Sequence, residues 1–248
     1  MDAHQTSIFT VILIIALVVG MIFAYFITTL IKHHRRNAQL YKEKMLAEIT
    51  TLENERKRMS ADLHDELGPI LAGVKLKLSS LEVTDKDDEI TLKKIHENID
   101  ELVSRMKDIS NDLMPSVLLK RGLVEAIEVT VEEINRSNSV EITFIHHDLP
   151  SLKEDKVINL YRIIQEIIHN TLKHAQATEL IIEIRADSHK LIVLSRDNGK
   201  GFNYSNVSKE ASGHGLRNLF TRTDALGGNM YINTAVGGGT IYTFEVPV

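Results

Sequence analysis

The sequence contains no cysteine among its 248 residues. This excludes disulfide bonds and metal sites built on thiolates, and it suits a reducing compartment. An excess of basic residues is also lacking, because 29 Lys and Arg stand against 34 Asp and Glu, for a formal net charge of −5. A chain with this balance is not expected to bind nucleic acid directly. Short-period repeats and low-complexity tracts are absent as well, and the apolar content of 43% is ordinary for a folded protein.

One long run near the amino terminus lacks charge altogether. Residues 8–31, IFTVILIIALVVGMIFAYFITTLI, are longer than the stretch of about 20 apolar residues that spans a bilayer as a helix. The preceding MDAHQTS has no Lys or Arg, unlike the positive start of a secretory signal. We therefore expect a retained membrane anchor. A buried core helix is the alternative, although such helices are rarely apolar on all sides for so long.

Basic residues follow the anchor directly, in the stretch KHHRR at 32–36. The positive-inside rule keeps such residues in the cytoplasm. We therefore expect residues 1–7 to lie outside the membrane and everything from Lys32 onward to lie inside. Seven residues leave no room for a folded extracellular sensor domain.

Heptad patterns mark two helices beyond the anchor. Apolar residues alternate by four and three over 45–81, with one extra residue between Leu63 and Leu67 that shifts the phase. After a polar turn at 82–89, a second series repeats without a fault at Leu92, Ile95, Ile99, Leu102, Met106, Ile109 and Leu113. Two such helices predict an antiparallel hairpin, and two paired hairpins predict a homodimeric four-helix bundle. A coiled-coil spacer between membrane and head fits the periodicity equally well.

The segment RMSADLHDELGPI separates these two interpretations. His64 directly follows Leu63, which belongs to the apolar heptad column. It therefore lies about 100° round the helix from that column, on the solvent-accessible flank. Asp65 can hold the proton of one ring nitrogen, which leaves the other nitrogen as a nucleophile. Pro69 lacks an amide hydrogen and clashes with the carbonyl four residues before it, so we expect a bend within a turn of His64. His96 lacks such neighbours and is expected to be merely solvated.

The last hundred residues are expected to mix strands with helices. Five segments are typical of strands: 140–146, 179–186, 190–196, 230–235 and 240–248. Between the first two lies a predicted helix at 151–175, with Ser151 and Glu154 as a capping-box start. Glu166, Asn170 and His174 recur every four residues along it. Such a polar file is most often a solvent-facing side, but a Glu–Asn pair one turn apart can also orient Mg²⁺ through oxygen ligands.

Two glycine-bearing loops are candidates for nucleotide contacts. RDNGKGF places Asp197 at a strand end beside tight turns, where its carboxylate can accept hydrogen bonds from an amino group such as that of adenine. SGHGLRNLF places glycines at a helix start, which suits a phosphate group. No P-loop motif occurs, and each loop alone is also explained by turn formation. GGGT at 237–240 is interpreted as a hairpin turn, with Thr240 as a further candidate contact.

In their order along the chain, these features resemble the sensor histidine kinases of two-component systems. The resemblance covers roughly residues 55–248, and the subgroup is the one that serves NarL/LuxR-type response regulators. It implies an α+β multidomain fold with a single transmembrane helix, a dimeric antiparallel four-helix bundle and a GHKL-type α/β sandwich. The implied domains are an extracytoplasmic tail at 1–7, a transmembrane helix at 8–31, a cytoplasmic signalling helix at 32–55, a dimerisation and histidine phosphotransfer hairpin at 56–117, and a catalytic ATP-binding domain at 118–248.

The resemblance also implies a role for each motif. DLHDELGP is similar to the H box, so His64 would be the phosphoacceptor, Asp65 the activating base and Glu66 a helper. QEIIHNTLKHA is similar to the N box, in which Asn170 and Glu166 would hold Mg²⁺. DNGKGF and GHGL are similar to the two glycine boxes, the first with Asp197 on adenine and the second at the hinge of the ATP lid. The implied ATP contacts are Asn170, Lys173, His174, Asp197, Gly199, Gly201, Gly213, His214, Gly215, Leu216 and Thr240.

The implied activity is that of an ATP-dependent protein-histidine kinase with ATP and Mg²⁺ as cofactors. Its implied partners are a second copy of the chain, a response regulator, membrane lipids and a partner membrane sensor, with no direct nucleic acid. The implied location is the inner membrane of a bacterium, with the amino terminus outside and the catalytic part in the cytoplasm. Pro69 replaces the Gln or His that relatives with phosphatase activity often carry, so we expect weak phosphatase activity.

Two rival functions remain open at the level of sequence. One is an ATP-driven clamp or a protein-serine kinase of the same ATPase superfamily. The other is a membrane-anchored dimeric scaffold that binds nucleotide but is catalytically dead. Acid-labile, base-stable phosphate on the protein separates the first from a histidine kinase, and slow ATP turnover separates the second.

Overall fold

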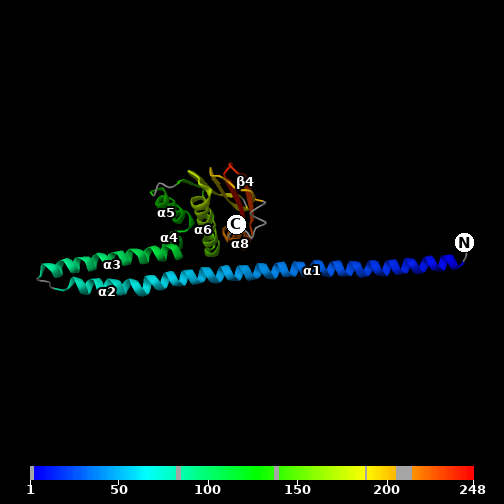
Figure 1. The fold of residues 1–248 in the computed structure, drawn as a ribbon, viewed down its shortest axis with the longest axis horizontal. Coiled ribbons are helices and arrows are strands. Elements are labelled where there is room, and N and C mark those ends of the chain that lie inside the picture. Colours follow the sequence, from blue (N-terminus) through cyan, green and yellow to red (C-terminus); the bar gives the residue numbers. More distant parts are fainter. Residues whose placement is uncertain (1–2, 82–84, 137–139, 188, 205–213) are drawn as a thin grey trace. The chain divides into compact units, whose positions relative to one another are not determined.

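The structure, a computed structural model, describes residues 3–81, 85–136, 140–187, 189–204 and 214–248. Its contacts divide the chain into two compact units, Met1–Glu48 and Ile49–Val248. Figure 1 shows the succession of helices and strands. The division falls inside the stretch 32–55, where we expect a signalling helix.

The first unit is helical throughout its described residues and belongs to helix α1, Ala3–Asp62. An 18-residue window of this helix has a mean hydropathy of 2.6, and none of that window is buried. Within the described parts of the chain, this is one helix long and apolar enough to cross a membrane. A buried core helix is hard to reconcile with side chains such as Met21 and Phe23, each 64% exposed.

The second unit contains the hairpin that the heptads predict. Its first arm is the end of α1, a π-helical turn η1 (Leu63–Leu67) and α2 (Gly68–Ser79), and its second arm is α3 (Lys86–Leu113). Ser60 Oγ lies 2.8 Å from Ser110 Oγ, and Lys75 Nζ lies 2.5 Å from an oxygen of Asp100. A later residue of the first arm, Lys75, thus contacts an earlier residue of α3 than Ser60 does, so the two arms run antiparallel.

The extra residue in the heptad pattern coincides with η1. A π-turn accommodates one residue more than an α-turn. An exposed apolar column on the first arm therefore recurs every seven residues except across η1, where the interval is eight, at Leu52, Met59, Leu67, Val74 and Leu81. Pro69 falls in the first turn of α2, where a missing amide hydrogen is tolerated.

The two apolar columns of α3 differ in exposure. One column packs against the first arm and is buried or half-buried, at Leu92, Ile99, Met106 and Leu113. The other column remains exposed, with values of 38% for Ile95, 52% for Leu102 and 53% for Ile109. The hairpin thus covers one of its apolar faces and leaves the other open.

The prediction for His96 is wrong. Its ring is half-buried rather than solvated, because Nε2 lies 2.9 Å from Ser79 Oγ and Nδ1 lies 3.0 Å from the carbonyl oxygen of Leu92. The side chain therefore links α3 to the end of α2. The heptad pattern places His96 beside the seam but carries no information on the serine opposite.

The rest of the second unit is a lobe built on a five-stranded sheet in the order β1-β2-β3-β5-β4. Only β1 and β2 pair in parallel, and the other neighbours are antiparallel. Side chains alternate between buried and exposed along β2, β3 and β5. The five predicted strands are confirmed as β1 (Glu141–His146), β2 (Glu179–Asp187), β3 (Lys190–Asp197), β4 (Asn229–Thr234) and β5 (Thr240–Pro247).

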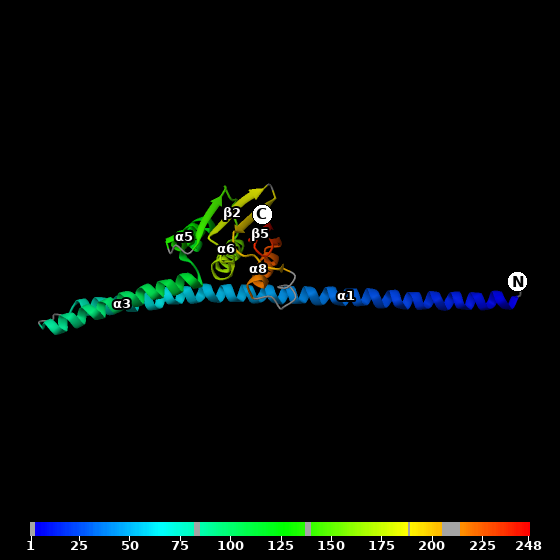
Figure 2. The same ribbon diagram turned by 45° about the horizontal axis from the view of Figure 1, so that its top comes forward.

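Helices cover one face of this sheet, as Figures 1 and 2 show. They are α4 (Ser116–Arg121), α5 (Leu123–Arg136), α6 (Glu154–Asn170), a second π-turn η2 (Thr171–Ala175) and α8 (His214–Ala225). The predicted capping box is wrong, because α6 begins at Glu154 and Ser151 lies before its N-cap. The N-cap is Lys153, in an extended conformation and without a side-chain cap bond.

The core of the lobe lies between the sheet and these helices. Its fully buried side chains include Ile163 and Ile167 from α6, Leu219 from α8, and Ile182 and Phe244 from the sheet. Each such side chain contributes about 1.5–3 kcal/mol by leaving water.

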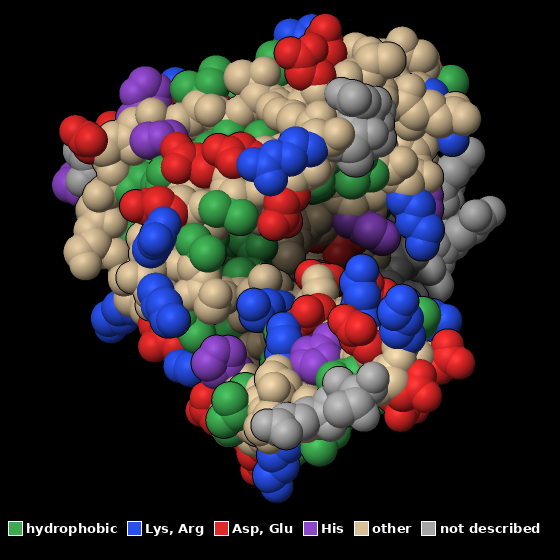
Figure 3. Space-filling model, turned by 90° about the vertical axis from the view of Figure 1, so that its left-hand side faces the viewer, with side chains coloured by type: hydrophobic (Ala, Val, Ile, Leu, Met, Phe, Trp, Pro, Cys, Tyr) green, Lys and Arg blue, Asp and Glu red, His purple; other side chains and the backbone are tan. Residues whose placement is uncertain are grey.

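On the face seen in Figure 3, acidic and basic side chains are interspersed rather than gathered by sign, so no field of a single sign is concentrated there.

Candidate functional site

A cavity of about 360 Å³ opens at one end of the lobe, where α6 ends and α8 begins. This volume is in the range of small-molecule sites. Eight of the residues predicted to bind ATP or Mg²⁺ line it: Glu166, Asn170, His174, Asp197, Gly201, Gly215, Leu216 and Thr240. The end of α6, the two glycine-bearing loops and Thr240 are far apart in the sequence but line the same pocket, as the sequence predicts for a nucleotide site.

Asp197 is the best-defined polar group of the cavity. It ends β3 and is only 6% exposed. Its Oδ1 accepts hydrogen bonds from the backbone N–H of Gly199, at 2.9 Å, and of Thr240, at 3.2 Å. Within the described part of the chain, no hydrogen bond is found to its Oδ2. One oxygen therefore holds the carboxylate in place, and the other remains available to accept a hydrogen bond from a ligand.

The glycines around Asp197 are required by close packing. Gly201 has φ +56° and Gly239 has φ +71°, the left-handed region that L side chains rarely adopt. A Cβ on Gly199 would collide with the backbone of Ala175, and one on Gly239 with the carbonyl of Asp197. These glycines let the loops close tightly on the end of β3.

Glu166 and Asn170 face the start of α8. They lie one turn apart on α6, both half-buried. A Cβ on Gly215 would collide with Oε1 of Glu166 and lie 3.2 Å from Oδ1 of Asn170. Both oxygens therefore stand beside the first turn of α8, where free backbone N–H groups favour an anion.

The donor set fits Mg²⁺ in the company of a phosphate. One carboxylate and one amide oxygen are hard ligands, and Mg²⁺ takes its remaining positions from waters and substrate phosphates. No group of three or more His, Cys, Asp or Glu side chains able to hold a metal occurs in the part of the chain that the structure describes. The residues present thus suit a metal that arrives with a nucleotide better than a metal held by protein alone.

Tyr242 lines the cavity and was missed by the sequence analysis. It lies on β5, 5% exposed. Burial raises the pKa of its hydroxyl to about 12, and the nearby carboxylates of Asp197 and Glu166 add to the shift. The hydroxyl therefore stays protonated at neutral pH. Only its position on a strand adjacent to β3 could have pointed to it.

Other lining residues escaped the sequence analysis too. The rings of His169 and His174 meet edge to face with centroids 6.4 Å apart. Lys200 belongs to the motif DNGKGF itself, so its presence was open to prediction. The remaining missed members of the lining are Thr171, Ala175 and Phe202.

Four predicted ATP contacts are not part of this lining. Gly199 lies beside it and donates its backbone N–H to Asp197. Lys173 is exposed and does not line the cavity. His214 is the first residue of α8, and its side chain is not among those described. Gly213 lies outside the described residues.

His64 lies on η1, in the hairpin, with its side chain 77% exposed. The predicted position on the accessible flank is confirmed. Its Nδ1 lies 3.0 Å from Oδ1 of Asp65. When Nδ1 carries the proton and donates it to this carboxylate, Nε2 presents its lone pair to solvent. Glu66 is exposed as well, and π-turns of this kind are frequent at functional sites.

Comparisons with known proteins match both parts of this arrangement. The family model for histidine kinase-, DNA gyrase B- and HSP90-like ATPases matches residues 155–248. The model described as histidine kinase matches residues 55–118. The oxygen sensor histidine kinase NreB of Staphylococcus carnosus is 28% identical over 232 residues, which make up 92% of this chain and 66% of that protein. The chain thus spans slightly less than two thirds of that relative.

Solved structures of histidine kinases are also similar. The blue-light activated histidine kinase of Erythrobacter litoralis EL346 shares 18% identity, with a TM-score of 0.47 over 78% of this chain and 60% of that one. The histidine kinase AdeS of Acinetobacter baumannii shares 17%, with a TM-score of 0.42 over 74% and 97%. One family model covers the hairpin with His64 and the other covers the lobe with the cavity, so the chain belongs to the histidine kinases.

Proposed function

We propose that the chain is an ATP-dependent protein-histidine kinase that phosphorylates His64 and passes the phosphoryl group to an aspartate of a response regulator. The observation that carries this proposal is the pairing of an exposed, carboxylate-backed histidine with a nucleotide-sized cavity lined by Asp197, Asn170 and Glu166. Phosphoryl transfer needs an in-line nucleophile and neutralised charge, and little covalent help beyond these.

Each side chain has a defined task in the proposed reaction. When bound, ATP would supply the γ-phosphoryl group with ADP as the leaving group, and Mg²⁺ would supply positive charge that neutralises the phosphate oxygens. Asp197 would orient the base through the oxygen that the backbone leaves open, and Asn170 and Glu166 would hold the cation. Asp65 keeps the proton on Nδ1 of His64 and stabilises the positive ring that forms as Nε2 takes the phosphoryl group.

Replacement of His64 tests this assignment. The full chain with His64→Gln, incubated with γ-labelled ATP, is expected to incorporate no label, whereas His96→Gln is the matched control and is expected to retain labelling. The bound phosphate should be labile in acid and stable in base. Undiminished labelling of His64→Gln would overturn the assignment, acid-stable phosphate would favour the serine kinase, and nucleotide binding without turnover would favour the inert scaffold.

The proposed active form is a homodimer. Two apolar columns stay exposed in the described part of the chain: Ile95, Leu102 and Ile109 on α3, and Leu52, Met59, Leu67, Val74 and Leu81 on the first arm. Both are heptad columns, so a second hairpin with the same periodicity matches them. Two hairpins joined in this way form a four-helix bundle with His64 on its flank.

The proposed location is the inner membrane of a bacterium. Exposed apolar side chains over residues 13–31 and the basic stretch at 32–36 support one membrane-spanning helix with the kinase in the cytoplasm. The signal would reach this helix from the bilayer, from a partner membrane sensor or from the cytoplasmic side. Small mismatch energies between helix and bilayer are sufficient to bias a bistable bundle.

The proposed phosphoryl acceptor is a response regulator of the NarL/LuxR type. The match of residues 55–118 to the histidine kinase model supports a regulator partner. Phosphatase activity toward this regulator is expected to be weak, because Pro69 has no side-chain group to position a water. Loss of label from a phosphorylated regulator mixed with the kinase and ADP measures this activity.

A further inference from the structure

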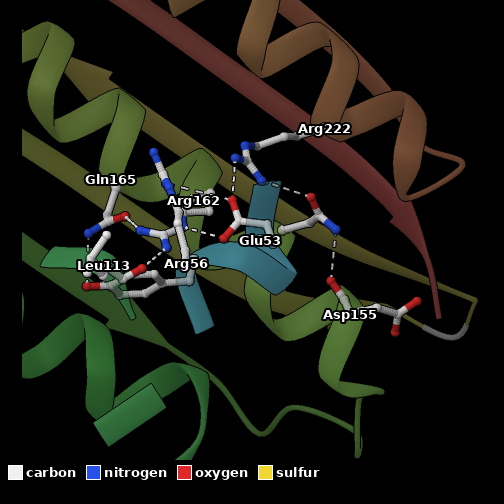
Figure 4. A network of polar contacts seen from close by, with 9 residues as sticks. Glu53, Arg56, Leu113, Asp155, Arg162, Gln165 and Arg222 are labelled. Atoms are coloured by element: carbon white, nitrogen blue, oxygen red, sulfur yellow. Dashed lines mark hydrogen bonds and ion pairs between the residues drawn. The ribbon is translucent and has the colours of Figure 1, made fainter. Parts of the chain in front are cut away.

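Charged side chains are buried in two places among the described residues. Asp197 lies in the cavity, and the other three form one network: Glu53 of α1, Arg162 of α6 and Arg222 of α8. Oε2 of Glu53 accepts a hydrogen bond from Nε of Arg162 at 3.1 Å, and Oε1 accepts one from Nη2 of Arg222 at 2.6 Å. Figure 4 shows the carboxylate between the two guanidinium groups.

The two arginines are themselves held by further contacts. Arg162 donates to Gln165 Oε1 at 2.7 Å and to the carbonyl oxygen of Leu113, and Arg222 donates to Asn159 Oδ1 at 3.1 Å. Figure 4 shows these contacts around Glu53. The network therefore connects the catalytic lobe both to α1 and to the last residue of α3.

The network is largely removed from solvent. The side chains of all three members are less than 10% exposed, and burial lowers the pKa of Arg162 from its usual value. A buried charge that loses its partner is strongly destabilising, whereas an intact buried pair adds little net stability. Loss of the Glu53 carboxylate from this site would therefore leave two buried guanidinium groups without their ion-pair partner.

The docked orientation directs the cavity away from its own His64. The first residue of α6, Glu154, pairs with Lys57, and Arg162, two turns later, pairs with Glu53. As α6 advances by eight residues toward the cavity, its contact on α1 moves back by four, away from the reactive ring. Asn170 lies eight residues beyond Arg162 on α6, and from Glu53 to His64 the first arm rises about 16 Å.

We propose that Glu53, clamped between Arg162 and Arg222, is the latch of an autoinhibited arrangement in which the ATP-binding lobe is docked out of reach of His64. This inference rests on the proposed function. Glu53 is on the same helix, α1, as the apolar run that ends at Ile31. A rotation or shift of that helix removes the carboxylate from the two guanidinium groups at once, which frees the lobe to approach the histidine.

The first test removes the charge of the latch. In phospholipid vesicles, the full chain with Glu53→Gln is expected to phosphorylate His64 about tenfold faster than the wild type, because the docked population falls when a buried charge is left unpaired. The matched control is Glu55→Gln, on the same helix, whose side chain is more exposed and pairs with Arg58. It is expected to behave as the wild type does.

The second test closes the latch permanently. Because the chain has no cysteine, Lys57→Cys with Glu154→Cys places the only two thiols at a pair of residues that touch in the docked form. A short bismaleimide should join them readily in the wild-type background and less readily with Glu53→Gln. The joined protein is expected to bind ATP but to lose autophosphorylation, whereas each single-cysteine variant treated likewise keeps it.

The outcomes separate the latch from the proposed function. The latch is overturned if the wild type is labelled and the folded Glu53→Gln variant is labelled no faster. It is also overturned if the cross-linked protein keeps full activity. Either result leaves the kinase assignment intact. Absence of label from the wild type and from every variant overturns the kinase assignment itself. Thermal unfolding of each variant shows whether it is folded, and the joined protein supplies the answer where Glu53→Gln is not.

Discussion

The carboxylate of Asp197 is fixed by the backbone on one side only. Its Oδ1 accepts hydrogen bonds from two backbone N–H groups. These belong to loops whose glycines allow a close approach to the end of β3. The sequence motif DNGKGF was sufficient to predict this residue, because a carboxylate at a strand end beside two glycines is a local pattern. It was insufficient for Tyr242, whose place in the cavity depends on the pairing of β5 with β3.

Asp197→Asn is expected to weaken ATP binding by about 10- to 100-fold, the cost of one charge-assisted hydrogen bond. The amide keeps an oxygen for the two backbone donors, so the unfolding temperature should stay close to that of the wild type. Titration of the full chain with a fluorescent ATP analogue gives the affinity. Unchanged affinity in a folded variant would exclude Asp197 as the base-binding group.

Tyr242 makes the stability of the lobe sensitive to alkaline pH. Its pKa is raised from 10.0 to about 12, so the folded state holds the proton more tightly than the unfolded chain does. This contribution is fully present below pH 10 and is lost as the pH rises toward 12, and it amounts to about 3 kcal/mol.

Denaturant unfolding between pH 8 and 12 measures this contribution. Tyr242→Phe is expected to lose less stability over that interval than the wild type, by about 3 kcal/mol. Tyr231→Phe, which alters an exposed tyrosine on β4, is the control. Parallel curves for Tyr242→Phe and the wild type would show that the hydroxyl ionises equally easily in both states.

At the scale of elements, periodicity predicted most of what was found. The strands, both helical arms and the extra residue beside His64 follow from the spacing of apolar residues. The π-turn η1 was not predicted as such, because a phase shift shows only that one residue is additional and not how the backbone accommodates it. The start of α6 was misplaced by a motif, Ser151 with Glu154, that the backbone does not use.

Pro69→Ala is expected to change stability by less than about 1 kcal/mol, because proline is tolerated in the first turn of α2. In an uninterrupted helix the same replacement would gain about 3 kcal/mol. Ala72→Pro, in the interior of α2, is the matched comparison and is expected to lose about that amount. Unfolding followed by helical circular dichroism gives both values, and a large gain for Pro69→Ala would argue against the π-turn.

For the whole molecule, the sequence predicted the parts but not the contact between them. Glu53 follows Leu52 in the heptad series and would be assigned to a solvated flank, yet it is buried. Only the approach of Arg162 and Arg222, more than one hundred residues away, accounts for this. Such a contact has no local pattern in the sequence.

Leu102→Glu is expected to weaken self-association by about 100-fold or more, because a charge enters the uncovered column of each copy. Glu101→Gln, at an exposed neighbour paired with Arg105, should leave association unchanged. Sedimentation of the full chain in detergent micelles distinguishes dimer from monomer. A Leu102→Glu variant that remains dimeric would place the interface elsewhere.

The last carbonyl oxygen of α3, that of Leu113, is bonded by the guanidinium of Arg162. Helices leave their final carbonyl groups without an internal partner, so the closing turn of α3 is secured by a side chain from beyond its own end. When Arg162 moves away, the carbonyl oxygen of Leu113 bonds to water instead, and the last turn of α3 can unfold locally. The connection at Met114 and Pro115 then becomes longer and more flexible, which would help the undocked ATP-binding lobe to reach His64.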